Sequence, residues 1–247
     1  MFAIPVIKAG DSRIMSRRTR YSMKPSFNDE RFAGALRGFG PIGIVAALAI
    51  ALVGNAYFIP VAGLLVLAWG YLSHTPWREL GFVRPRHWIV TVAVGIAFGV
   101  VLKLFMKAIA MPLLGADPVN QPYHYLAGNR DALPGAIWMM IATAGFGEET
   151  VFRGFLFERL GKLFGSRRWG KPAIVVLTSA AFGIAHYASQ GVPGVQQATM
   201  VGLVFGSIFA LTGRIWMLMI AHAAFDLTAL TLIYWSLETK VAHFVFK

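Results

Sequence analysis

Long apolar runs separated by short polar segments dominate the chain after about residue 38. A helix that crosses a bilayer needs roughly 20 such residues. A short turn between Asn55 and Pro60 separates the first two runs, so either of them could be re-entrant. The pattern predicts an all-α, polytopic membrane helix bundle of about seven transmembrane helices. The spans are expected near residues 40–56, 58–74, 88–113, 133–156, 171–189, 195–212 and 215–236.

The composition supports the same class. The 247 residues are 57% hydrophobic and only 14% charged, with a mean hydropathy of +0.61, whereas a soluble domain carries about 25% charged residues. The chain has no cysteine, which excludes disulfides, iron–sulfur clusters and thiolate zinc sites. Any bound metal would need histidine and carboxylate ligands.

Basic residues give the chain a net charge of +12. They lie in short blocks between apolar runs, so we expect lipid and not nucleic acid as their partner. The connections after the second and fourth runs are basic, and those after the third and fifth are nearly neutral. The positive-inside rule then predicts a multi-pass protein of the cell (inner) membrane with a cytoplasmic N-terminus and an external C-terminus. The basic residues of these connections are Arg78, Arg84, Arg86, Arg159, Lys162, Arg167, Arg168 and Lys171.

The chain divides into two parts by composition. Residues 1–38 are polar and basic, and we expect a cytoplasmic arm that is disordered or lies on the membrane surface. No long apolar stretch follows the first residues, so a cleaved signal peptide is not expected. Residues 39–247 form the predicted transmembrane domain.

Small residues recur every four positions in two of the predicted spans. Gly95 and Gly99 form one such stripe, and Ala198, Gly202 and Gly206 form the other. Such stripes let helix backbones approach closely. We expect them to pack helices and to have no part in a functional site.

Three ionisable residues stand close together in the fourth apolar run. A charged group in the bilayer core costs about 2.5–3.5 kcal/mol or more, so a functional site is the default explanation. Glu149 and Arg153 are i and i+4 on a helix and share one face, where they can form a buried ion pair that braces the structure. Glu148 is rotated by about 100° onto another face. Because Glu148 lacks a cation on its own helix, it is the candidate general base.

Two later runs each add a histidine. Phe182 and His186 share a face of the fifth run, and His222 and Asp226 share a face of the seventh. We expect the three polar faces to converge, because the alternative exposes several ionisable groups to lipid separately. Their oxygen and nitrogen atoms are also donors that Zn²⁺ accepts.

At these residues the chain resembles a known family. The segments 148–153, 182–186 and 222–226 are similar in order and spacing to the EExxxR, FxxxH and HxxxN/D motifs of the CPBP family. This family comprises the type II CAAX prenyl endopeptidases and bacterial relatives that include bacteriocin-processing and self-immunity proteins. The resemblance covers about residues 130–235, which we therefore expect to be a protease-like core.

The resemblance implies an intramembrane endopeptidase that acts on peptides or membrane-associated proteins. It implies that Glu148 and His186 activate water, that His222 and Asp226 stabilise the oxyanion, and that Glu149 and Arg153 complete the site. The prenyl proteases have Asn where this chain has Asp226, and an ionised Asp cannot donate a hydrogen bond. Either Asp226 is protonated, or it orients His222 and leaves the donor role to that ring.

Other interpretations stay open beside this one. The family has been described both as metalloproteases and as glutamate proteases, and we expect the metal-free reaction with no cofactor, with zinc as the alternative. The chain could also be a non-catalytic immunity or scaffold protein, although a scaffold would not need Glu148, His186 and His222 together. A transporter is disfavoured because the sequence has no repeated halves.

Overall fold

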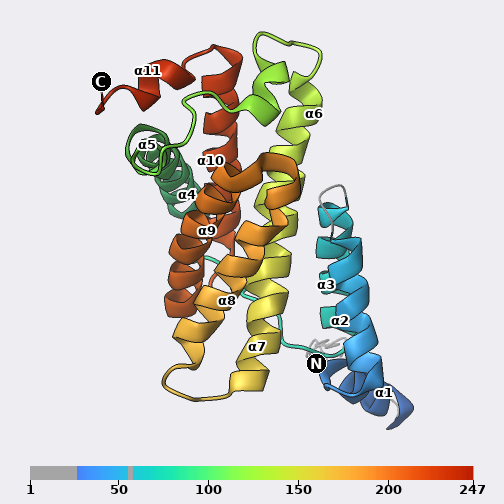
Figure 1. The fold of residues 1–247 in the computed structure, drawn as a ribbon. Helices are drawn as coiled ribbons and strands as arrows, with labels where there is room; N and C mark the ends of the chain where they lie inside the picture. Colours follow the sequence, from blue (N-terminus) through green and yellow to red (C-terminus); the bar gives the residue numbers. More distant parts are fainter. Residues whose placement is uncertain (1–26, 55–57, 247) are drawn as a thin grey trace, which may run out of the picture.

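The computed structural model describes residues 27–54 and 58–246, and every regular element in these ranges is a helix (Figure 1). Most of the predicted basic arm, residues 1–26, and the centre of the turn at 55–57 lie outside the described residues. The last part of the arm forms helix α1 (Phe27–Arg37), which has acidic residues in its first turn and Arg37 in its last. That arrangement of charges favours a helix through its dipole.

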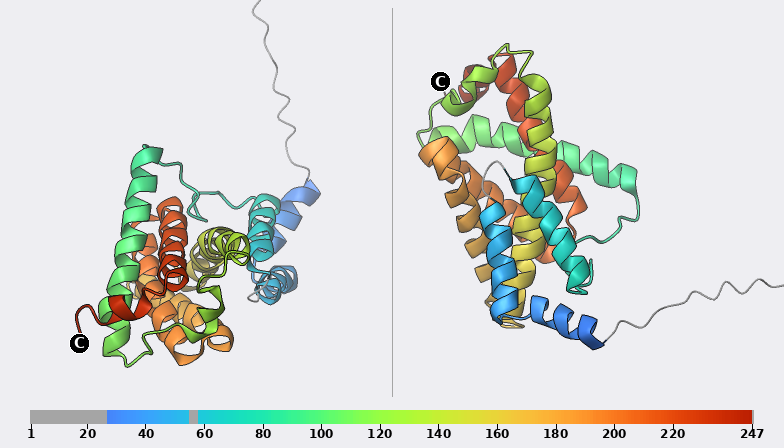
Figure 2. Two further views of the ribbon diagram at one scale, coloured as in Figure 1. Left: turned by 90° about the horizontal axis from the view of Figure 1, so that it is seen from above. Right: turned by 90° about the vertical axis from the view of Figure 1, so that its right-hand side faces the viewer.

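Helices α2 (Pro41–Val53) and α3 (Ile59–Leu72) occupy the first two predicted runs. They lie side by side at one edge of the molecule (Figures 1 and 2). Helix α3 contacts the rest of the bundle where Gly63 faces the ring of Phe146 and Gly147 faces the backbone of Ile59. A side chain at Gly147 would overlap Ile59, so this glycine lets the two helices approach closely.

The central helix of the bundle covers the fourth predicted run and continues beyond it to Phe164. Its middle part is wound as a π-helix, a form that is rare and is frequent at functional sites. The preceding helix α4 ends in one π-helical turn, and a short 3₁₀ helix follows it. These elements are α4 (Trp88–Phe105), η1 (Met106–Ala110), α5 (Met111–Leu113), η2 (Gln121–Leu126), α6 (Leu133–Trp138), η3 (Met139–Glu148), η4 (Thr150–Leu156) and α7 (Phe157–Phe164).

The last part of the chain contains α8 (Gly170–Ala185), α9 (Tyr187–Thr212), α10 (Trp216–Tyr234) and α11 (Glu238–Ala242). The connection expected between residues 189 and 195 contains a break at Gly191, where the backbone is not helical. Gly191 has a φ of 63°, and Pro193 follows inside the same helix. The chain therefore kinks within α9, at a residue that adopts positive φ without steric cost.

Long apolar helices identify the chain as a membrane protein. Within the described ranges, three helices are long and apolar enough to cross a bilayer: Trp88–Leu113, Tyr187–Thr212 and Trp216–Tyr234. The bent pair 28–37 and 41–53 can supply a fourth span, with a bend of 58°. Helices α3 and α8 are apolar but have only 14 and 16 residues. The count of seven spans therefore stays a prediction.

Both stripes of small residues pack helices, as the sequence predicted. Gly95 and Gly99 lie against α10, where a Cβ at Gly99 would overlap the carbonyl of Ala221. Gly202 lies against α8, where a Cβ would come within 3.0 Å of the Cα of Ser179. These close approaches hold α4 on α10 and α8 on α9, which are the most extensive helix contacts in the described structure.

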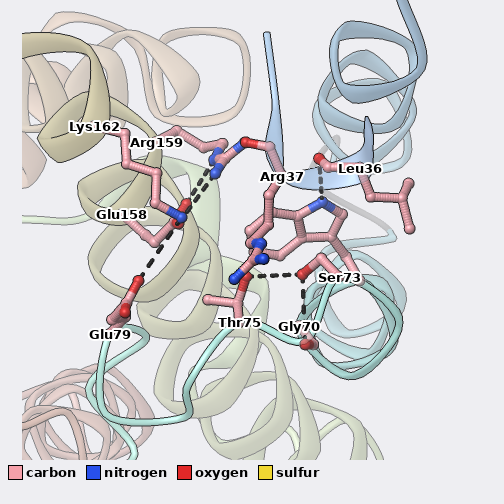
Figure 3. Close-up of polar contacts among 10 residues, drawn as sticks. Leu36, Arg37, Gly70, Ser73, Thr75, Glu79, Glu158, Arg159 and Lys162 are labelled. Atoms are coloured by element: carbon pink, nitrogen blue, oxygen red, sulfur yellow. Dashed lines mark hydrogen bonds and ion pairs between the residues drawn. The ribbon is translucent and has the colours of Figure 1, made fainter. Parts of the chain in front are cut away.

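The basic connections gather at one end of the bundle. Lys162 lies between Glu158 and Glu79, with its Nζ 3.7 Å from Glu79 Oε2, and Arg159 donates a hydrogen bond of 2.8 Å to the carbonyl of Arg37 (Figure 3). These contacts join α1, the segment before α4, and α7. Helix α11 lies at the opposite end of the bundle (Figure 1).

Candidate active site

Glu149 is the centre of a buried charged cluster built from two helices. Its Oε1 accepts a hydrogen bond of 2.9 Å from Arg153 Nη1 and another of 2.7 Å from His222 Nδ1. The predicted i, i+4 ion pair is confirmed, and the contact with His222 adds a partner 73 residues away. The Glu149 side chain is completely buried, so it joins η3 and η4 to α10 in the interior of the bundle.

Aromatic rings contact both of the side chains that bind Glu149, Arg153 and His222. The Arg153 guanidinium lies 4.8 Å from the ring centroid of Phe182 and 5.5 Å from that of Phe205. The His222 ring packs edge-on against the same two phenylalanines. A desolvated cation over aromatic faces gains about 2 kcal/mol. Phe182 of α8 and Phe205 of α9 therefore stabilise the Arg153 cation and also pack against the His222 ring.

Glu148 and Asp226 face the other nitrogen of His222. Glu148 Oε2 lies 3.6 Å from Nε2 and Asp226 Oδ2 lies 4.0 Å from it, both beyond ordinary hydrogen-bond distance. Their side chains are 14% and 30% exposed, whereas that of Glu149 is fully buried. The adjacent glutamates therefore have different environments. Glu149 is fully buried and bound to Arg153 and His222, whereas Glu148 lines a cavity.

His186 lies at the C-terminal end of α8 and is held by its own helix. Its Nδ1 is 2.8 Å from the carbonyl of Phe182, one turn earlier. A carbonyl only accepts, so Nδ1 carries the hydrogen and a neutral ring presents Nε2 as an acceptor. The ring also packs against Phe182 at 4.6 Å. One phenylalanine thus contacts both histidines and Arg153.

A cavity of about 130 Å³ connects these residues. It is lined by residues of η2, α4, α6, η3, α8, α9 and α10, so the structure brings together polar groups from all three predicted motifs. Its polar lining consists of Lys103, Asn120, Tyr123, Tyr125, Thr143, Glu148, His186, Gln190, Gln197, His222 and Asp226.

Unpaired polar atoms concentrate at the same place. In the part of the chain that the structure describes, four buried side-chain atoms have no hydrogen-bond partner: Glu148 Oε2, Glu149 Oε2, Thr150 Oγ1 and Arg153 Nη2. Buried polar groups are otherwise nearly always paired. Their location within six consecutive residues makes this stretch the candidate functional site.

Carboxylates and histidines are also the residue types that bind zinc. A zinc site needs three or four protein ligands at about 2.0–2.2 Å from the ion. Among the residues at 27–54 and 58–246, no three His, Asp or Glu side chains are arranged to hold one ion. The donor set as folded does not fit the metal alternative.

Several cavity residues were not foreseen from the sequence. Lys103 is the single charged residue of α4, and an isolated charge in an apolar run could have indicated a functional role. Nothing in the sequence around Gln190 and Gln197 indicated that they line the cavity. Tyr123 comes from a segment expected to be only a connection, and its hydroxyl accepts a hydrogen bond of 3.4 Å from Gln190. Burial raises the pKa of Tyr123 to about 12, so the hydroxyl stays protonated at neutral pH.

The comparison with protein families agrees with the motifs. Residues 131–228 match the family described as type II CAAX prenyl endopeptidase Rce1-like. This range includes every residue of the charged cluster and both histidines of the cavity. Residues 131–228 form an Rce1-like domain. The family assignment expected at about 130–235 is thereby confirmed. No curated protein and no solved structure matches the chain.

Proposed function

We propose that the chain is an intramembrane endopeptidase that hydrolyses peptide bonds in peptides or membrane-associated proteins. The Rce1-like domain implies a protease of this class. The observation that carries the proposal is the shared cavity, in which Glu148, His186, His222 and Asp226 meet inside an apolar bundle. A base, a second proton acceptor and a hydrogen-bond donor around one cavity are the groups that amide hydrolysis requires.

In the proposed reaction, Glu148 and His186 hold the attacking water. Glu148 Oε2 has no protein partner, and the His186 Nε2 is an acceptor, so either can accept a proton from water. Glu148 accepts that proton while the water oxygen bonds to the scissile carbonyl carbon. The carbonyl π electrons move onto oxygen, and a tetrahedral oxyanion forms.

His222 stabilises this oxyanion. Its Nδ1–H is donated to Glu149, and in the protonated ring Nε2–H is free, since Glu148 and Asp226 lie at 3.6 and 4.0 Å. One such donor accelerates the reaction by about 10²–10³-fold. When the oxyanion collapses, the C–N bond breaks and Glu148 returns its proton to the leaving amine. Asp226 and Glu149 orient the His222 ring.

The proposal includes seven spans with a cytoplasmic N-terminus. It is supported by the basic segments at one end of the bundle, where Lys162 meets Glu79 and Arg159 meets Arg37. The cavity lies toward the other end, beside η2. Substrates would therefore reach it from the external side of the membrane.

A reporter fusion tests this orientation. A reporter after Arg168 should behave as cytoplasmic, and one near Asn120 as external, because the positive charges stay inside. The measurement is the activity of a paired alkaline phosphatase and fluorescent-protein reporter in cells. The reverse pattern would contradict both the span assignment and the external access.

A cleavage assay tests the function itself. The purified chain in lipid vesicles should hydrolyse members of a peptide library, detected by mass spectrometry, and Glu148→Ala should not. Cleavage should be unaffected by a chelator, and elemental analysis should find no stoichiometric zinc. Bound zinc with reversible chelator inhibition would favour the metalloprotease instead. No cleavage of any peptide or membrane protein would favour an immunity or scaffold role.

A further inference from the structure

Lys103 is a buried cation in a helix that has no other charged residue. Its side chain is 5% exposed, and its Nζ donates to Gln197 Oε1 at 3.1 Å and lies 4.8 Å from the ring centroid of Phe225. Among the described residues, no carboxylate oxygen lies within 4.0 Å of this ammonium. An ammonium has three donors and is costly to bury without a counter-ion. Lys103 therefore needs an anion nearby.

The neighbouring lysine does not share this need. Lys107, one turn later, is equally buried but pairs with Glu238 at 2.8 Å and donates to the carbonyl of Pro118 at 2.6 Å. Lys103 lines the same cavity as Asp226, and it also lines a second cavity with Lys107 and Glu238, whose carboxylate is already paired with Lys107. The Lys103 Nζ lies beside the ring of Phe225, the residue that precedes Asp226 on α10.

The charged groups at the cavity include more carboxylates than cations when Lys103 is left out. Glu148, Glu149 and Asp226 are three carboxylates, and Arg153 and protonated His222 supply two positive charges. Without Lys103 the site has an excess negative charge in an apolar surrounding, and the reaction then adds an oxyanion to it. Such an excess opposes the transition state, because charges interact strongly where water is excluded.

We propose that Lys103 is a positioning residue whose ammonium balances the negative charge of Asp226 beside His222. The inference rests on the proposed peptidase function. It also explains the aspartate at a position where the resembled prenyl proteases have a neutral asparagine. An asparagine needs no cation, so the requirement for Lys103 should exist only while residue 226 is an aspartate.

A double-mutant cycle between Lys103 and Asp226 tests the proposal. Lys103→Met should lower kcat at least tenfold in the parent, with KM changed less than twofold. In an Asp226→Asn background the same substitution should lower kcat less than threefold, because the charge it balanced is gone. Lys103→Arg keeps the charge and should retain more activity than Lys103→Met.

The melting temperatures of the same four proteins provide a readout that needs no activity. Each single variant leaves one charge of the cavity unbalanced, so the double variant should melt above both Lys103→Met and Asp226→Asn. If the parent cleaves nothing, the proposed function fails, and this thermal cycle still decides the pairing.

Lys107→Met is the matched control, because it removes a lysine of equal burial that has its own partner. Its effects on kcat and melting should be the same in both backgrounds. Equal losses from Lys103→Met in both backgrounds would overturn the proposal. A rise in KM from Lys103→Met in both backgrounds would also overturn it, because Lys103 would then be a substrate-binding group. Additive changes in melting temperature from Lys103→Met and Asp226→Asn would overturn it as well.

Discussion

Glu148→Gln should yield a folded protein whose kcat is lower by about 10²–10⁴-fold, the usual contribution of a general base. Glutamine has the same shape but cannot accept the proton of the attacking water. Stability should change little, because Glu148 Oε2 has no hydrogen-bond partner to lose and the side chain is partly open to the cavity. The measurements are single-turnover peptide cleavage, peptide affinity and thermal unfolding in the same vesicles.

Glu148→Gln should lower the rate of cleavage without weakening peptide binding. Peptide affinity should stay within about threefold of the parent, since only the reacting step loses a group. A Glu148→Gln protein that keeps more than a tenth of the parent kcat would remove Glu148 from the reaction. Loss of activity together with a large drop in melting temperature would make Glu148 a structural residue.

Glu149→Gln should instead destabilise the protein by about 3–5 kcal/mol, the typical cost of breaking a buried ion pair. The substitution leaves Arg153, which is 1% exposed, without its carboxylate and removes the anion that His222 Nδ1 contacts at 2.7 Å. Thermal unfolding in detergent and the yield of folded protein measure the effect. Activity should fall as well, because the His222 ring loses the partner that orients it.

A double variant provides the control for Glu149. Removing both partners of a buried pair is often close to neutral, so Glu149→Gln combined with Arg153→Met should melt above Glu149→Gln alone. Equal melting temperatures and equal residual activities for Glu148→Gln and Glu149→Gln would contradict the division of roles between the adjacent carboxylates.

Much of the site was accessible from the sequence because helix periodicity acts over a few residues. Glu149 and Arg153 are four positions apart, and the structure joins them at 2.9 Å even though this segment is wound as a π-helix. The same local rule placed Glu148 on a different face. The stripe of Gly95 and Gly99 also predicted a close helix contact correctly, since only small residues permit one.

Helix ends were harder to predict. The span expected to end at residue 189 ends at Ala185, and between residues 189 and 195 the helical backbone is interrupted at Gly191. Hydropathy identifies apolar segments but does not locate a helix end inside one. A kinked helix and two helices joined by a short turn have nearly the same hydropathy profile. The backbone angles at one glycine made the difference.

The apolar pattern alone determined that this chain is a helical membrane protein, because length and hydropathy decide whether a segment can cross a bilayer. The spacing of ionisable residues determined which side chains share a face. Only the tertiary structure decided that Glu149 takes His222 as a second partner, that Asp226 is farther from that ring than Glu149, and that Lys103 enters the cavity. These contacts join helices distant in sequence, and their geometry depends on how small residues and aromatic rings fit across interfaces, which has no local sequence period.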